Sequence, residues 1–149
     1  MAEEDAPEVP NVGVLLFVPY RAMEDRVFAR LAAAGYGDVT VAQGRVFQRI
    51  GPDGTRLTEL AEQAQVTKQT AGFLVDQLER AGYVTRAVDP SDARARLVRI
   101  TARGAAAVAV GAAVVAEVEA EWTRHLGVRQ MGQLRRALER LREVTDPWA

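Results

Sequence analysis

Residues 82–101 form the segment that most restricts what this chain can fold into. Two runs with the alternating pattern typical of β-strands flank a polar turn, and this turn carries Asp92, Arg94 and Arg96. The pattern predicts a β-hairpin with positive charge at its tip. A tip of this charge suits an anionic partner.

The segment before the hairpin, residues 57–81, predicts two short helices joined by a tight turn. Thr58 is expected to cap the first helix, Thr67 is the natural N-cap of the second, and Gly82 ends the second helix. Such a short connection is the geometry of a helix-turn-helix. Gln65 stands in this turn where many such turns use glycine, so we expect a modestly strained or altered turn there. A helix-turn-helix followed by a basic hairpin, or wing, indicates binding to duplex DNA.

The second helix of a helix-turn-helix enters the major groove with its N-terminal residues toward the base edges. The candidate contact residues in this part of the chain are Thr67, Lys68, Gln69, Thr70 and Gly72. Gln69 can pair with the N6 and N7 atoms of adenine, and Lys68 can donate to guanine or to a phosphate. Phe73 packs either on a thymine methyl group or in the core, and we expect the core.

The charged residues of the wing suggest separate roles. Arg94 can enter the minor groove, where narrow A·T-rich segments concentrate negative potential. Asp92 would repel phosphate if left alone, so we expect it to hold the Arg94 guanidinium by charge-assisted hydrogen bonds. Arg86 and Arg96 are better placed as phosphate contacts than as base readers. The alternative is that these arginines only form a solvated face.

The net charge of the whole chain understates the charge of this segment. The formal net charge is −1, which does not favour a nucleic-acid partner. Between residues 56 and 103, however, eight basic residues stand against six acidic ones. Attraction to phosphate depends on this local field rather than on the total.

Long helical patterns flank the helix-turn-helix and the wing. Residues 12–33 predict an amphipathic first helix, Thr101 caps a long alanine-rich helix, and residues 129–144 predict a last helix with one apolar face. A module of this size has little other apolar surface against which the apolar faces of these helices could pack. We therefore expect them to form a dimer interface, with packing inside one subunit as the alternative.

The resulting fold class is mainly α with a small β wing, an α+β fold. A winged helix-turn-helix is flanked by dimerisation helices, and residues 1–149 are expected to form one domain. Its expected parts are a flexible, solvated tail at 1–10, dimerisation helices at 11–34 and 102–146, and a DNA-binding lobe at 38–101.

The composition excludes several classes of function. The chain has no cysteine, so disulfides, thiolate metal sites and thiol-based redox sensing are excluded. The single histidine, His125, does not make a metal site by itself, and we expect neither a metal ion nor a cofactor. A glycine-flanked catalytic serine, a phosphate-binding glycine loop and paired histidines are also missing. We therefore expect a protein that is not an enzyme.

No segment predicts a signal peptide or a membrane span. The first ten residues are acidic, and the longest uncharged run, residues 104–116, is short of the ~20 apolar residues that a span needs. We expect a cytoplasmic protein that does not contact a membrane.

Three motifs in and around the hairpin resemble those of the multiple antibiotic resistance regulator (MarR) family. Residues 78–84 carry leucine-glutamate-x-x-glycine-aromatic-valine, residues 89–94 carry aspartate-proline-x-aspartate-x-arginine, and residues 101–104 carry threonine-x-x-glycine. The similarity covers about a third of the chain. Ala93 departs from the pattern, because arginine is common there in the family.

The resemblance implies a homodimeric winged helix-turn-helix regulator of a bacterium or an archaeon. Such a protein binds a pseudo-palindromic operator in double-stranded DNA, usually represses nearby genes, and in many cases releases DNA when a small aromatic acid or phenol binds. Residues that would line such a ligand pocket here are Phe17, Tyr20, Arg21, Phe47 and Trp122. The same aromatic residues are more simply explained as core. The alternative function is a winged-helix module that binds proteins and not DNA.

Overall fold

The computed structural model describes residues 8–148, so most of the tail expected at 1–10 lies outside the described residues. The elements are α1 (Val12–Ala33), α2 (Val41–Phe47), β1 (Thr55–Arg56), α3 (Leu57–Ala64), α4 (Lys68–Arg80), β2 (Val84–Asp89), β3 (Asp92–Ile100), α5 (Ala102–Leu126) and α6 (Val128–Thr145). The mainly α fold with a small β wing is confirmed. None of the helices within the described residues is long and apolar enough to cross a membrane.

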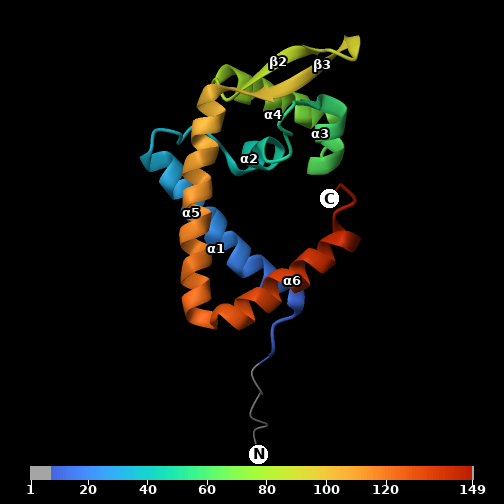
Figure 1. Ribbon diagram of the computed structural model, residues 1–149. Coiled ribbons are helices and arrows are strands. Elements are labelled where there is room, and N and C mark those ends of the chain that lie inside the picture. The colour runs from blue at the N-terminus through green and yellow to red at the C-terminus, as the bar shows by residue number, and fades with distance from the viewer. Residues whose placement is uncertain (1–7, 149) are drawn as a thin grey trace, which may run out of the picture.

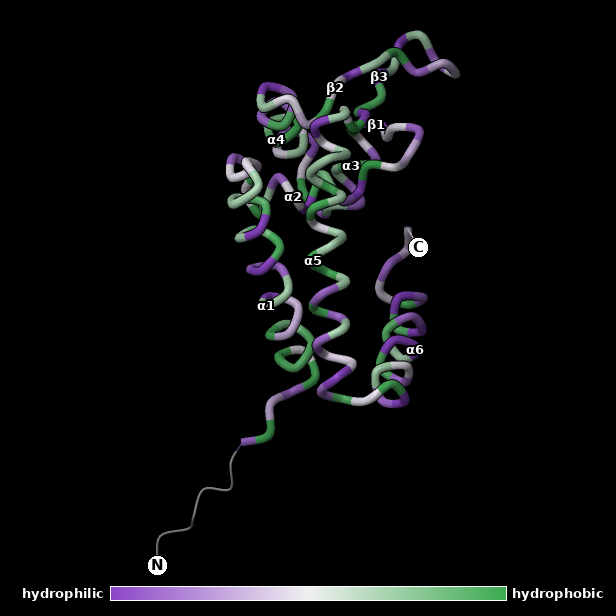
Figure 2. The backbone as a smooth tube through the Cα atoms, turned by 60° about the vertical axis from the view of Figure 1, so that its left-hand side comes forward, coloured by the Kyte–Doolittle hydropathy of each residue, from purple (hydrophilic) through white to green (hydrophobic). Residues whose placement is uncertain are grey.

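The helices and the sheet are arranged as a lobe with a long helical stem (Figure 1). Helices α2, α3 and α4 lie with the sheet at one end, and α5 runs away from them beside α1. Helix α6 then turns back from the far end of α5, so that the C-terminal end of the chain returns toward the lobe (Figure 2). Ion pairs tie α1 to α5, among them Arg30 Nη2 to Glu117 Oε2 at 2.9 Å.

The helix-turn-helix has the local geometry that its sequence predicts, with one exception. The Thr67 side chain caps α4, and Gly82 follows the helix with a φ of +86°. Gln65 adopts the left-handed conformation with a φ of +56°, so the expected strain in the turn is confirmed. The expected cap at Thr58 is wrong: α3 begins at Leu57, directly after β1, and Arg56 occupies the N-cap position without a side-chain cap.

The sheet has three antiparallel strands in the order β1-β3-β2. Strand β1, with only two residues, was not predicted from the sequence, and it pairs Thr55 with Val98. Strands β2 and β3 are in regular register from the Val84–Ile100 pair to the Val88–Arg96 pair, but the next pair joins Asp89 to Asp92. The residues in between, 93–95, form an irregular bulge. Asp92 and Arg96 are therefore strand residues rather than turn residues.

The core of the lobe is formed between α3, α4 and the sheet. Its most deeply buried side chains include Leu60, Val75, Leu78, Tyr83, Val84 and Val98. Helix α3 contributes Leu60 to this core, and α4 contributes Val75 and Leu78. Phe73 is not a core residue, because 56% of its surface is exposed.

Candidate nucleic-acid interface

The outer face of α4 is exposed because the opposite face of the helix packs into the lobe. Ala71 and Leu74 point into the lobe, whereas Lys68 and Gln69 are exposed. The Thr67 hydroxyl accepts the backbone N–H of Thr70 at 3.0 Å and donates to the Thr70 hydroxyl at 2.9 Å. Both threonines therefore have a local structural role that is compatible with contact to an outside partner.

Gly72 lies closer to α3 than the other candidate residues do. It is half-buried, and a side chain there would have its Cβ 3.7 Å from Leu57 Cδ2. Among the predicted DNA-contact residues of α4, Lys68 and Gln69 are exposed, and their side chains form no hydrogen bond within the described residues.

Arg94 and Arg96 are both exposed on the wing, and neither forms an ion pair within residues 8–148. The expected ion pair between Asp92 and the Arg94 guanidinium is not formed. Asp92 Oδ1 instead accepts the backbone N–H of Arg94 at 3.0 Å, because the bulge turns this part of the backbone toward the carboxylate. Asp92 thus shapes the bulge that carries Arg94 and leaves the guanidinium available.

A second carboxylate, Asp89, holds the other side of the turn. Its Oδ1 accepts hydrogen bonds from the hydroxyl of Ser91 at 2.7 Å and from the backbone N–H of Ser91 at 2.9 Å. Arg56 Nη2 lies 2.7 Å from Asp89 Oδ2 and joins β1 to the tip of the wing. The hydrogen bonds from Ser91, followed by the one from Arg56, lower the pKa of Asp89 to about 2.

Arg86 is paired with two carboxylates on the surface of the lobe. Its two terminal nitrogens contact Asp76 Oδ1 at 2.7 Å and Glu79 Oε1 at 2.9 Å, and both carboxylates lie on α4. This fork fixes β2 against α4 and offsets one of the two negative charges of these carboxylates. Sequence analysis did not foresee the pairing, although the 3-residue spacing of Asp76 and Glu79 places them on neighbouring parts of one helix face.

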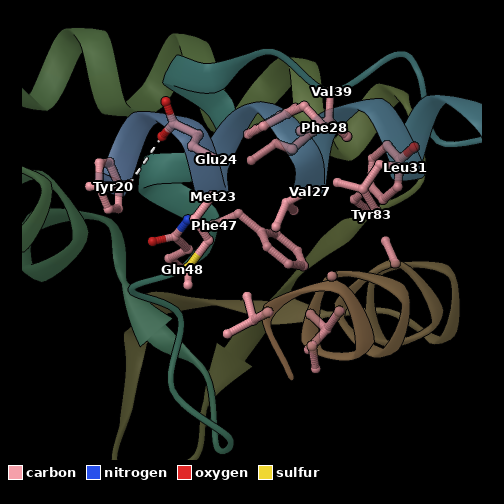
Figure 3. A pocket seen from close by; sticks show the side chains of 17 residues that line it. Tyr20, Met23, Glu24, Val27, Phe28, Leu31, Val39, Phe47, Gln48 and Tyr83 are labelled. Carbon is pink, nitrogen blue, oxygen red and sulfur yellow. Dashed lines mark hydrogen bonds between the residues drawn. The ribbon is translucent and has the colours of Figure 1, made fainter. Parts of the chain in front are cut away.

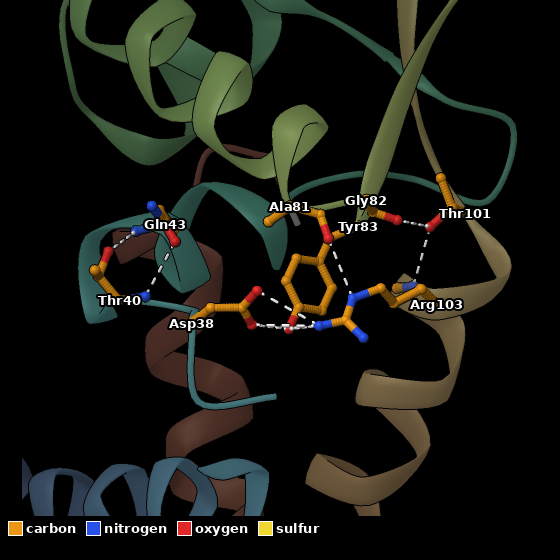
Figure 4. A network of polar contacts seen from close by, with 9 residues as sticks. Asp38, Thr40, Gln43, Ala81, Gly82, Tyr83, Thr101 and Arg103 are labelled. Carbon is orange, nitrogen blue, oxygen red and sulfur yellow. Dashed lines mark hydrogen bonds and ion pairs between the residues drawn. The ribbon is translucent and has the colours of Figure 1, made fainter. Parts of the chain in front are cut away.

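A polar cluster joins the start of α5 to the lobe (Figure 4). The Tyr83 hydroxyl donates to Asp38 Oδ1, and the Arg103 guanidinium lies over the Tyr83 ring at 4.6 Å. Arg103 also donates from Nε to the carbonyl oxygen of Ala81 at 3.1 Å. Burial first, and then the hydrogen bond to Asp38, raise the pKa of Tyr83 to about 12. Sequence reasoning missed this cluster, because Asp38 is far from its partners along the chain.

An apolar cavity of about 420 Å³ lies between α1, α2 and α5 (Figure 3). Tyr20 and Phe47 line it as predicted, but Phe17, Arg21 and Trp122 do not. The expected cation, Arg21, is therefore absent from the lining, and its guanidinium lies over the Phe17 ring at 5.8 Å. The lining instead holds a carboxylate: Glu24 Oε2 accepts a hydrogen bond from the Tyr20 hydroxyl at 3.0 Å.

Comparisons with known proteins agree with this geometry. The sequence profile described as "MarR family" matches residues 37–95. The HTH-type transcriptional repressor Rv2887 of Mycobacterium tuberculosis is 30% identical over 139 residues, which is 93% of this chain and 95% of the relative. The structure of Rv2887 in complex with salicylic acid superposes with a TM-score of 0.64 at 29% identity, and the match covers 91% of this chain and 99% of Rv2887.

Two further solved structures share the fold. A crystal structure of MarR gives a TM-score of 0.72 at 26% identity and covers 91% of this chain and 96% of MarR. The Staphylococcus aureus MepR–DNA complex gives a TM-score of 0.68 at 22% identity, with 91% of this chain and 99% of MepR covered. With a relative at 30% identity along nearly the full length of both chains, this protein belongs to the MarR family.

Proposed function

We propose that this chain is a cytoplasmic, homodimeric transcriptional repressor that binds a pseudo-palindromic operator. The observation that carries the proposal is that one lobe presents both an exposed outer face of α4 and an exposed basic wing. Lys68 and Gln69 lie on that face, and Arg94 and Arg96 lie on the wing without an internal ion pair among the described residues. A major-groove helix next to basic groups for the backbone and the minor groove is the arrangement that duplex DNA requires. The repressor Rv2887 and the MepR–DNA complex support the same function.

The dimer is inferred from the stem. Residues 12–18 of α1 are all exposed, and all of them except Gly13 are apolar. A helix that is apolar on every side requires burial. Helix α6 adds exposed apolar side chains at Leu138, Leu141 and Val144 and has no buried residue of its own. A second copy of the chain, which is the partner implied by the family, would cover both helices.

The cavity between α1, α2 and α5 is the proposed site of a small aromatic ligand. It touches the stem through α5 and the lobe through Leu78 and Tyr83, so an occupant would contact both parts. The salicylic acid complex of Rv2887 supports an aromatic ligand for this family. Such a ligand causes the protein to release the operator if it binds more tightly to an arrangement of stem and lobe that does not fit DNA than to the arrangement that does.

Selection of bound duplexes from a random library with the purified chain tests the DNA function directly. A repressor enriches one pseudo-palindromic sequence, and its affinity falls as the salt concentration rises, because neutralised phosphates release counterions. A winged-helix module that binds only proteins would enrich no sequence and would show no salt-dependent affinity for DNA.

Replacing Arg94 by alanine should weaken binding to the selected operator by about 1–3 kcal/mol, since an exposed guanidinium at the wing would be lost from the groove. Electrophoretic mobility shift at fixed salt measures the effect. Arg124→Ala is the matched control, because Arg124 is also exposed but lies in the last turn of α5, away from the lobe. Equal affinities of the two variants would contradict the role of the wing.

Replacing Arg86 by glutamine should also weaken operator binding, for a different reason. The change leaves Asp76 and Glu79 without their cation on the surface of α4 that faces DNA. We therefore expect the triple variant Arg86→Gln/Asp76→Asn/Glu79→Gln to regain most of the lost affinity in the same mobility-shift assay. Persistence of the full loss in the triple variant would instead indicate that Arg86 contacts phosphate, as the sequence first suggested.

A further inference from the structure

Phe73 is an exposed aromatic side chain on the outside of α4, and the DNA contacts proposed above do not include it. It is 56% exposed, although it lies in the middle of a helix whose Ala71, Leu74 and Val75 are buried. Since an α-helix turns by about 100° per residue, Phe73 lies within about 40° of Gln69 on the helix surface. It therefore belongs to the same outer face as the residue best suited to read a base.

The position along the helix fits a second base contact. Phe73 lies four positions after Gln69, which corresponds to a rise of about 6 Å along the axis. Successive bases on one strand are about 3.4 Å apart, so the two side chains can reach neighbouring parts of one half-site. Asp76, one turn further, would repel DNA, but its carboxylate is paired with Arg86 at 2.7 Å.

The surroundings of Phe73 favour DNA over a protein partner. A contiguous patch of exposed apolar side chains marks a surface that binds another protein. Most exposed large apolar side chains of the described residues lie on α1 and α6, whereas α4 carries Phe73 alone. Its neighbours three and four positions away on the helix are the polar residues Gln69, Thr70 and Gln77, together with Asp76, which is paired with Arg86. A single apolar group among polar ones matches the edge of a base pair in the major groove.

We propose that Phe73 is a specificity-determining residue that packs on the C5-methyl group of a thymine in the operator half-site. The inference rests on the proposed DNA function and deepens it. A phenyl ring can neither donate nor accept a conventional hydrogen bond, and the thymine methyl is the apolar group that the major groove displays. Gln69 and Phe73 would then read adjacent positions by two different chemistries, one polar and one apolar.

The test replaces thymine by deoxyuridine, one position at a time, in the operator that the wild-type protein selects. Deoxyuridine keeps the base pair and loses only the methyl group. At the contacted position, loss of one buried methyl should weaken wild-type binding about fourfold, or about fifteenfold when both half-sites are changed. Phe73→Ala should bind the thymine operator more weakly and bind the thymine and deoxyuridine operators equally.

Two variants control for indirect effects. Gln69→Ala should lower the affinity and keep the deoxyuridine effect, whereas Phe73→Leu should keep part of it, because leucine is still apolar. Circular dichroism of each variant checks the fold, which an exposed substitution should leave unchanged. The proposal is overturned if the wild type is indifferent to deoxyuridine at every position, if the selected half-sites hold no constant thymine, or if Phe73→Ala still discriminates. Failure of the DNA function itself is a separate result, since no operator would then be selected.

Discussion

Replacing Gly104 by alanine should lower the free energy of unfolding by about 3 kcal/mol, at the upper end of the range for an overpacked site. A Cβ at this position would lie 2.3 Å from the carbonyl oxygen of Tyr83 and 2.8 Å from Ile100 Cγ2. The carbonyl cannot move away easily, because it also accepts the backbone N–H of Thr101 at 3.1 Å. The start of α5 would have to separate from the lobe.

Gly111→Ala is the matched control for this change, since Gly111 lies in the same helix. The nearest atom to its added Cβ would be Val27 Cγ1 at 3.5 Å, which is an ordinary contact. Alanine is the better helix former by up to about 1 kcal/mol, so this variant should be as stable as the wild type or slightly more stable. Urea unfolding followed by circular dichroism measures both variants, and equal stabilities would show that the junction tolerates a side chain.

The same junction explains the threonine-x-x-glycine motif in physical terms. The Thr101 hydroxyl donates to the carbonyl oxygen of Gly82 at 2.6 Å and accepts the backbone N–H of Gly104 at 3.1 Å. One side chain thus caps α5 and attaches it to the end of α4. Because Gly104 has no side chain, the start of α5 can approach the lobe closely enough for Thr101 to form both hydrogen bonds. Arg103, between them, adds its contact with the Tyr83 ring.

Features that depend on neighbours in the sequence could be predicted well. The caps at Thr67 and Thr101 follow from the preference for an N-cap hydroxyl, and the structure forms both of them. The unusual turn at Gln65 follows from its place where glycine is common, and the structure gives this residue a positive φ. The buried side of α4 follows from its 3.6-residue period. These signals sufficed to locate the helix-turn-helix and the wing.

Features that depend on distant partners could not be predicted. Asp38 meets Tyr83 across 45 positions of sequence, and β1 is too short to show any alternation. The pairing of Arg86 with α4 requires the angle between β2 and that helix, which no local rule supplies. The core position expected for Phe73 is wrong, because this residue lies outside the buried stripe of α4 and 56% of its surface is exposed. The exposure of this one side chain therefore became visible only with the fold.

Replacing Val18 by glutamate should convert the proposed dimer into a monomer at micromolar concentration. Val18 is 48% exposed in the single chain, so the charge should not disturb the fold of the subunit. In a dimer that covers α1, two unpaired carboxylates would be buried, each at a cost of at least ~2 kcal/mol. The dissociation constant of the dimer should therefore rise about a thousandfold or more. Sedimentation velocity over a range of concentrations measures the change.

Val41→Glu provides the matched control, because it makes the same substitution at an apolar residue of the lobe that is 39% exposed. Val41 is the first residue of α2, where the helix dipole favours a carboxylate. This variant should remain a dimer. The two variants also separate dimerisation from DNA contact: Val18→Glu should lose the added affinity of a two-half-site operator over a single half-site, because that gain requires two linked lobes. A wild-type chain that sediments as a monomer, or a Val18→Glu chain that stays dimeric, would mean that α1 is covered by some surface other than a second copy.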